Sequence, residues 1–147
     1  MPPAAVPPQS SHAFETIRSA LVTPWIRWLC LLGVCAAFIQ GGLDKAFDFP
    51  SAIAEMQHFG VTPAAPFALA TICLELIAPL MILTGFYRWL GAGALAVFTL
   101  LTLFIASHFW TMSGAERIMT ENVFFEHVGL IGAFLLIAWH DLRASGD

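Results

Sequence analysis

The stretch ATICLELIAPLMILTG, residues 70–85, is an apolar run long enough to cross most of a bilayer, and it carries one carboxylate, Glu75, near its middle. A charged side chain at the bilayer centre costs about 2.5–3.5 kcal/mol even on lenient insertion scales. Such a carboxyl group persists where it faces a protein interior, has a cationic partner or carries a proton. Pro79, four residues later, has no N–H to donate to the carbonyl of Glu75, which predicts a kinked helix. The groups around Glu75 are therefore central to any functional interpretation.

The composition is that of an integral membrane protein rather than a soluble globular chain. Of 147 residues, 59% are hydrophobic and 11% are charged, and the mean hydropathy is +0.79. The net charge is −4 and the six basic residues are scattered, so no basic patch supports nucleic-acid binding. The three cysteines lie in apolar runs without a CxxC pair. Cys35 and Cys73 would fall at similar depth on neighbouring helices, but we expect buried, inert thiols.

Helix signals divide the chain into four apolar spans. They predict an all-α membrane protein, a four-transmembrane-helix bundle with a short interfacial helix between spans one and two. Thr23 and Pro24 mark the start of the first span, as N-cap and first helical residue. The spans are expected at residues 24–47, 62–85, 88–111 and 123–140, the interfacial helix at 49–60 and a polar loop at 112–122.

Short segments flank the predicted transmembrane domain, which is expected at residues 23–142. Residues 1–22 are expected to form a disordered or amphipathic cytoplasmic segment. Within it, residues 1–11 are rich in Pro, Ala and Ser and lack an apolar period, which is typical of disorder. Residues 13–21 are predicted to be an amphipathic piece along the membrane surface. Residues 143–147 are expected to be a short tail.

The basic residues predict that both termini are cytoplasmic, because positive residues favour that side of a membrane. Four arginines would lie on the side of the termini and two basic residues on the other: Arg18, Arg27, Arg88 and Arg143, against Lys45 and Arg117. At about 1.5 Å rise per residue, several polar side chains then gather near the outer surface, with Glu75 about ten residues deep. Those expected to bind a ligand are Gln40, Lys45, His108, Glu126 and His127.

This arrangement predicts a polar pocket that opens outward and has Glu75, the candidate catalytic residue, at its floor. Adjacent Glu126 and His127 point about 100° apart on a helix, so one of them is expected to face the pocket. Each residue also has a simpler interpretation. Lys45 would mark the water boundary, His108 and His127 would be interfacial, and Glu75 would belong to an essential buried pair. Metal ligation by His108, His127 and a carboxylate is not expected, because neither histidine belongs to an HxxxH or ExxH spacing.

Structural roles are predicted for a second group of residues. Small residues recur every fourth position along the first span, which predicts a neighbouring helix packed closely there. Pro79 is expected to kink the second span, and Arg88 to follow the tight turn between spans two and three. The predicted structural residues are Gly33, Ala37, Gly41, Pro79 and Arg88.

An ordered set of short motifs resembles the DoxX family of small four-helix bacterial inner-membrane proteins. The motifs are Arg27, Gly-Gly-x-x-Lys at residues 41–45, Phe-Gly-x-x-Pro at 59–63, Glu75, Gly-x-x-Arg at 85–88 and Phe-Phe-x-x-x-x-Leu-x-Gly at 124–132. The resemblance covers about residues 27–141. Lys45, Glu75 and Arg88 match the family pattern, whereas the acidic pair Glu126-His127 departs from it. The resemblance implies a bacterial inner-membrane protein linked to redox chemistry, with relatives that include the membrane part of a thiosulfate:quinone oxidoreductase.

Two classes of function follow. The first is a redox-linked membrane subunit of a quinone-linked oxidoreductase, which binds a quinone-like molecule and uses Glu75 to exchange its proton. The sequence has no flavin, haem or iron–sulfur motif, so a soluble or membrane redox partner would have to supply electrons. The second is a non-enzymatic scaffold or carrier that anchors partner proteins. The protein is expected to lie in a lipid bilayer, and the sequence leaves open whether it forms a homo-oligomer.

Overall fold

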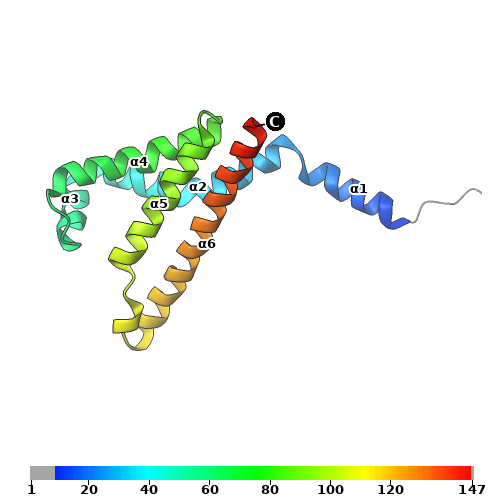
Figure 1. The fold of residues 1–147 in the computed structure, drawn as a ribbon. Coiled ribbons are helices and arrows are strands. Elements are labelled where there is room, and N and C mark those ends of the chain that lie inside the picture. Colours follow the sequence, from blue (N-terminus) through cyan, green and yellow to red (C-terminus); the bar gives the residue numbers. More distant parts are fainter. Residues whose placement is uncertain (1–8, 147) are drawn as a thin grey trace, which may run out of the picture.

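The computed structural model describes residues 9–146, which form six α-helices and one short 3-10 helix without a β-strand in that range. In chain order they are α1 (Gln9–Leu21), α2 (Pro24–Phe47), α3 (Phe49–His58), α4 (Ala64–Thr84), α5 (Arg88–Ala106), η1 (Phe109–Thr111) and α6 (Gly114–Ser145) (Figure 1). The stretches Pro24–Phe47, Ala64–Thr84, Arg88–Thr111 and Gly114–Ser145 are long and apolar enough to cross a membrane. The predicted all-α class with four spans is confirmed, and α3 is the short helix between the first two.

The last helix is longer than the apolar pattern indicated. Residues 112–122 were expected to form a polar loop, but α6 begins at Gly114. Ser113 stands at its N-cap, Glu116 lies in the first turn where the helix dipole favours an acid, and Arg117 pairs with Glu121 at 3.9 Å. These local signals extend the helix outside the apolar run. At the other end α6 continues through Ser145, so most of the predicted tail is helical, while Asp147 lies outside the described residues.

The N-terminal segment contains α1, which projects away from the other helices (Figure 1). This helix begins at Gln9, directly after the last proline of the N-terminal stretch, and therefore includes residues 9–11, which were expected to be disordered. The remainder of that prediction, residues 1–8, lies outside the described residues. Phe14, Ile17 and Leu21 are exposed on the helix surface.

The turn between α4 and α5 is held by contacts among three helices, made by the side chains of Arg88 and Asp141. Gly85 ends α4 in the left-handed conformation, with φ of 86°. Arg88 Nε donates a hydrogen bond of 2.8 Å to the carbonyl of Ile82, and its Nη1 lies 3.3 Å from Asp141 Oδ1 of α6. Asp141 Oδ2 also accepts a hydrogen bond of 3.1 Å from the backbone N–H of Trp89, in the first turn of α5. We call this end of the bundle the hairpin end and the opposite end the α3 end.

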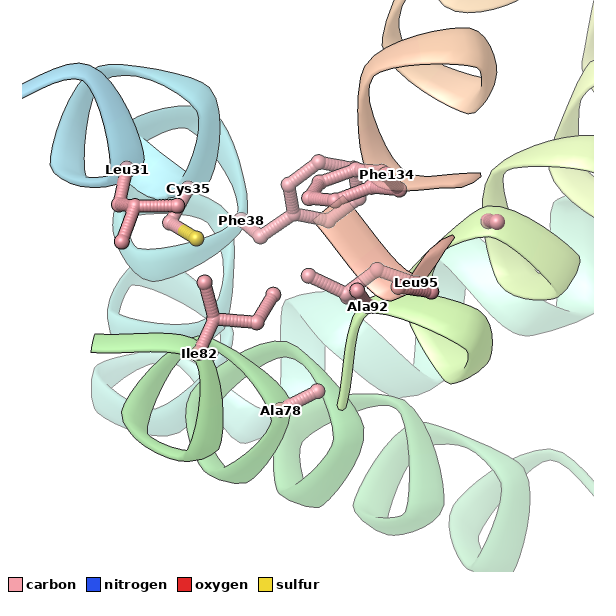
Figure 2. Packing of buried hydrophobic residues seen from close by; sticks show 10 residues of the cluster. Leu31, Cys35, Phe38, Ala78, Ile82, Ala92, Leu95 and Phe134 are labelled. Carbon is pink, nitrogen blue, oxygen red and sulfur yellow. The ribbon is translucent and has the colours of Figure 1, made fainter. Parts of the chain in front are cut away.

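The apolar core is formed by side chains of α2, α4, α5 and α6 that pack against one another (Figure 2). On α4, α5 and α6 these residues belong to the turns nearer the hairpin end. The Phe38 ring of α2 packs edge-on against Phe134 of α6, with 5.4 Å between ring centroids, and against Phe98 of α5 at 6.4 Å. Pro79 is buried in α4. The buried core consists of Leu31, Cys35, Phe38, Ala78, Ile82, Ala92, Leu95, Ala96, Phe134 and Ala138.

The face of α2 that packs against α4 is not the predicted one. A Cβ placed at Gly33 would have no neighbouring atom within 4 Å, and Ala37 is exposed. The close approach occurs at Gly42, where a Cβ would lie 2.9 Å from Leu76 Cδ2 and 3.0 Å from Glu75 Cβ. The prediction of close packing along the small-residue stripe is therefore wrong at Gly33 and Ala37, whereas Gly41 faces the Glu75 side chain of α4 and, with Ala37, lines a cavity.

The cysteines are not all buried. Cys35 belongs to the core, whereas Cys30 and Cys73 are exposed on the outer surface of the spans. The expectation of three buried thiols is wrong for these two, because the apolar surface of a span faces lipid as readily as protein.

Candidate functional site

A cavity of about 540 Å³ occupies the α3 end of the bundle. From their shared hairpin, α4 and α5 spread apart toward this end (Figure 1). The packed core stops short of it, since Glu75 is the lining residue of α4 nearest the hairpin and Ala78 and Pro79, on the next turn, are buried. Residues from α2, α3, α4, α5 and α6 line the space, so it is assembled from the whole bundle.

An ion pair between Lys45 and Glu75 forms one wall of the cavity. Lys45 Nζ lies 3.3 Å from Glu75 Oε1 and 3.2 Å from Oε2, and the two side chains are only 16% and 8% exposed. A cationic partner is therefore what allows Glu75 to lie within an apolar span. Gly41 leaves room for this pair, because a Cβ there would already contact Lys45 Nζ at 3.5 Å and Glu75 Oε2 at 3.7 Å.

A second carboxylate, Glu55 of α3, stands on the outer side of Lys45. Its Oε2 lies 3.8 Å from Lys45 Nζ, so the ammonium group is placed between two acids. Glu55 was not predicted from the sequence, nor were two hydroxyl residues of the lining, Thr71 and Thr102. Thr71 had a usable signal, because it precedes Glu75 by one helical turn on the same face. Glu55 and Thr102 had no such local signal, since their place in the cavity depends on how α3 and α5 pack.

The opposite wall is made by α6, and both Glu126 and His127 line it. The expectation that only one of them would face the pocket is wrong, because the cavity covers more than one helix position at its open edge. His127 Nδ1 lies 2.7 Å from the carbonyl oxygen of Val123. A carbonyl only accepts hydrogen bonds, so Nδ1 carries a proton, and in the uncharged form of the ring Nε2 is the atom with the free lone pair. One lysine thus stands against three glutamates in the lining, which gives the cavity an excess of negative charge.

Two predicted binding residues lie elsewhere. Gln40 is exposed and donates a hydrogen bond of 2.6 Å to Asp44 Oδ2, one turn along α2. His108 precedes η1, where its ring packs against Trp110 with 5.2 Å between centroids. Neither belongs to the cavity lining. Within residues 9–146, no three His, Cys, Asp or Glu side chains gather as a metal site would require.

The family model described as DoxX matches residues 29–108, more than half of the chain. The chain belongs to the DoxX family. The match runs from α2 to the end of α5 and includes Lys45, Glu55 and Glu75, whereas the α6 wall lies outside it. This DoxX protein is also similar to the inner membrane protein YphA of Escherichia coli (strain K12), with 28% identity over 115 residues, covering 78% of this chain and 82% of YphA. No solved structure matches it.

Proposed function

We propose that this DoxX protein binds an uncharged quinone-type molecule in its cavity, with the polar ring groups against the Lys45–Glu75 pair. The observation that carries the proposal is a nearly buried ion pair that forms a wall of an open cavity of about 540 Å³. Ligand sites of roughly 300–1,000 Å³ usually combine apolar walls with a few convergent polar groups. Phe98, Leu101 and Leu130 supply such apolar walls here.

The ion pair suits both oxidation states of a quinone. Lys45 Nζ donates hydrogen bonds, which a quinone carbonyl accepts, and the Glu75 carboxylate accepts hydrogen bonds, which a quinol hydroxyl donates. His127 Nε2 offers a further acceptor on the opposite wall. The excess of carboxylates disfavours anionic ligands by like-charge repulsion, so the chemistry supports a neutral molecule.

Reduction of a quinone to a quinol takes up a pair of electrons and a pair of protons. In the proposed role, Glu75 exchanges one of these protons with a ligand hydroxyl, water exchanges the other, and a soluble or membrane redox protein supplies or receives both electrons. We further propose that the protein lies in the bacterial inner membrane with both termini cytoplasmic. The α3 end, and with it the mouth of the cavity, would then face outward.

The test is ligand binding to the purified protein in nanodiscs, followed by isothermal titration with a water-soluble benzoquinone. We expect saturable binding that Glu75→Gln and Lys45→Gln each weaken by about tenfold or more, since hydrogen bonds to charged groups contribute about 1.5–3 kcal/mol. Glu121→Gln is the matched control, because Glu121 pairs with Arg117 on the surface of α6 and lies outside the lining. Absence of saturable binding to the folded wild-type protein would refute the proposal and leave the scaffold role as the better interpretation.

A further inference from the structure

A second hollow lies along the face shared by α4 and α5. It measures about 500 Å³, and no charged residue lines it. From the hairpin end it is bordered by Trp89, Gly93, Ala94 and Val97 of α5, and it reaches Phe98 and Leu101. We call it the α5 groove. Because α4 and α5 both belong to apolar spans, the groove faces the hydrocarbon region of the bilayer.

The α5 groove meets the polar cavity. Phe98 and Leu101 belong to the lining of both, so the two hollows adjoin at these side chains. From Trp89 to Leu101 the helix rises about 18 Å, a little more than half of a hydrocarbon core of about 30 Å. The two hollows together thus resemble a site for a molecule with a polar head and a long apolar tail.

From this shared boundary we infer that the ligand of the cavity is a lipid-soluble quinone whose hydrocarbon tail lies in the α5 groove. The inference rests on the proposed function and adds the substrate class and the path of the tail. The polar ring occupies the cavity beside Lys45 and Glu75. The tail passes Phe98 and Leu101 and follows α5 toward the hairpin end. The ligand then enters from the bilayer instead of from water, and no covalent step is involved.

Gly93 offers a direct way to block this path. A Cβ at Gly93 would have no neighbouring atom within 4 Å, so a larger side chain fits without disturbing the helices and fills the groove. Gly132 of α6 provides a matched control, since it has the same open surroundings and lines neither hollow. Gly93→Leu and Gly132→Leu therefore differ only in whether the new side chain enters the α5 groove. Ala94→Leu is a second groove variant for use if Gly93→Leu does not fold.

The experiment is photolabelling in phosphatidylcholine nanodiscs with a benzoquinone whose decyl tail ends in a diazirine. The labelled residues are identified by mass spectrometry, and the same ring without a tail serves as competitor and as a separate binding probe. We expect the label on residues 88–101 of the wild-type protein and its loss with excess tailless ring. Gly93→Leu should reduce this label at least about fivefold while the tailless ring binds within about twofold of wild type. Gly132→Leu should leave both values unchanged.

Other outcomes separate the two proposals. If the tailless ring does not bind the wild-type protein, the proposed function fails and the inference fails with it. If the ring binds but the tail labels α2 or α6, or the label on α5 is insensitive to competitor and to Gly93→Leu, the tail path is wrong and the proposed function stands. Native mass spectrometry tests whether a second copy of the protein covers the groove instead. A wild-type dimer that Gly93→Leu converts to a monomer would show that a second copy covers the groove, which also overturns the inference.

Discussion

Glu75 and Lys45 show how one residue pair accommodates charge inside an apolar helix bundle. Their side chains are 8% and 16% exposed, so both have lost most of their contact with solvent. The attraction within a buried pair repays this desolvation only in part, and an apolar pair of similar volume is often as stable. Removing one member is different, because the other charge is then left without its partner. The pair is therefore a poor source of net stability, and its position in the cavity wall is consistent with a binding role.

We predict strong coupling between these two residues in protein stability. Lys45→Gln should lower the free energy of unfolding by about 3 kcal/mol, because it leaves the buried Glu75 carboxylate without a cation. Glu75→Gln should lower it by less, since Lys45 keeps Glu55 at 3.8 Å. The double variant should cost less than the sum of the single variants by more than about 1 kcal/mol. Thermal or denaturant unfolding in detergent measures all three variants.

The surface pair Arg117–Glu121, with 3.9 Å between the charged atoms, is the control for this cycle. It is exposed, so its single variants should change stability by less than about 0.5 kcal/mol. Additive effects at Lys45 and Glu75 would show that the two side chains do not act as a pair.

At the scale of the elements, glycine positions set how closely the helices approach. The two glycines at the start of α5 illustrate the difference, although they are only two residues apart. A Cβ at Gly91 would lie 2.8 Å from the carbonyl oxygen of Ala78 and 3.0 Å from Met81 Cβ, both on α4. A Cβ at Gly93 would meet no atom within 4 Å. Gly91 is thus at the contact between α4 and α5, and Gly93 lies in the α5 groove.

We predict opposite effects of the same substitution at these positions. Gly91→Ala should lower the free energy of unfolding by about 1–3 kcal/mol, because the α4 backbone must move to make room for the new methyl group. Gly93→Ala should be neutral or stabilising by up to about 1 kcal/mol, since alanine favours the helix and meets no obstacle. Unfolding of the two variants in one detergent gives the comparison. Equal effects would mean that α4 and α5 do not approach at Gly91.

On the scale of the whole molecule, the two ends of the bundle differ in what fills them. The hairpin end is held by Arg88, Asp141 and the apolar core, whereas the α3 end contains the polar cavity. Because the two ends differ, the orientation in the membrane matters for function. It decides whether the cavity mouth faces the cytoplasm or the outside.

We predict that the hairpin end is cytoplasmic, because the arginines of the chain are concentrated there. Phe86 is 67% exposed in the α4–α5 turn, so Phe86→Cys reports on that end without disturbing Arg88. Gln57 is exposed on α3 and reports on the other end. In a background without the native cysteines, an impermeant maleimide added to intact cells should label Gln57→Cys and spare Phe86→Cys until the membrane is permeabilised. The reverse pattern would place the cavity mouth on the cytoplasmic side.

Much of the secondary structure was predictable because its causes are local. The first span was predicted at residues 24–47, and α2 has these bounds, since a Thr-Pro start and an apolar run act over a few neighbouring residues. The start of α6 was missed because residues 114–121 carry three charged side chains and no sustained apolar run. A search for apolar periodicity does not detect a helix that extends beyond the hydrocarbon core.

The sequence by itself determined the class of protein, the four spans, and the presence of one carboxylate deep in an apolar run. These properties follow from composition and short-range pattern. Only the tertiary structure decided which groups meet that carboxylate. Lys45 precedes Glu75 by thirty residues, and their contact depends on how α2 is rotated and shifted against α4, which the close approach of Gly42 to Leu76 sets. The rotation of α2 likewise places Ala37 and Gly41 in the cavity lining. The sequence alone does not determine which small-residue face of a helix packs against its neighbour.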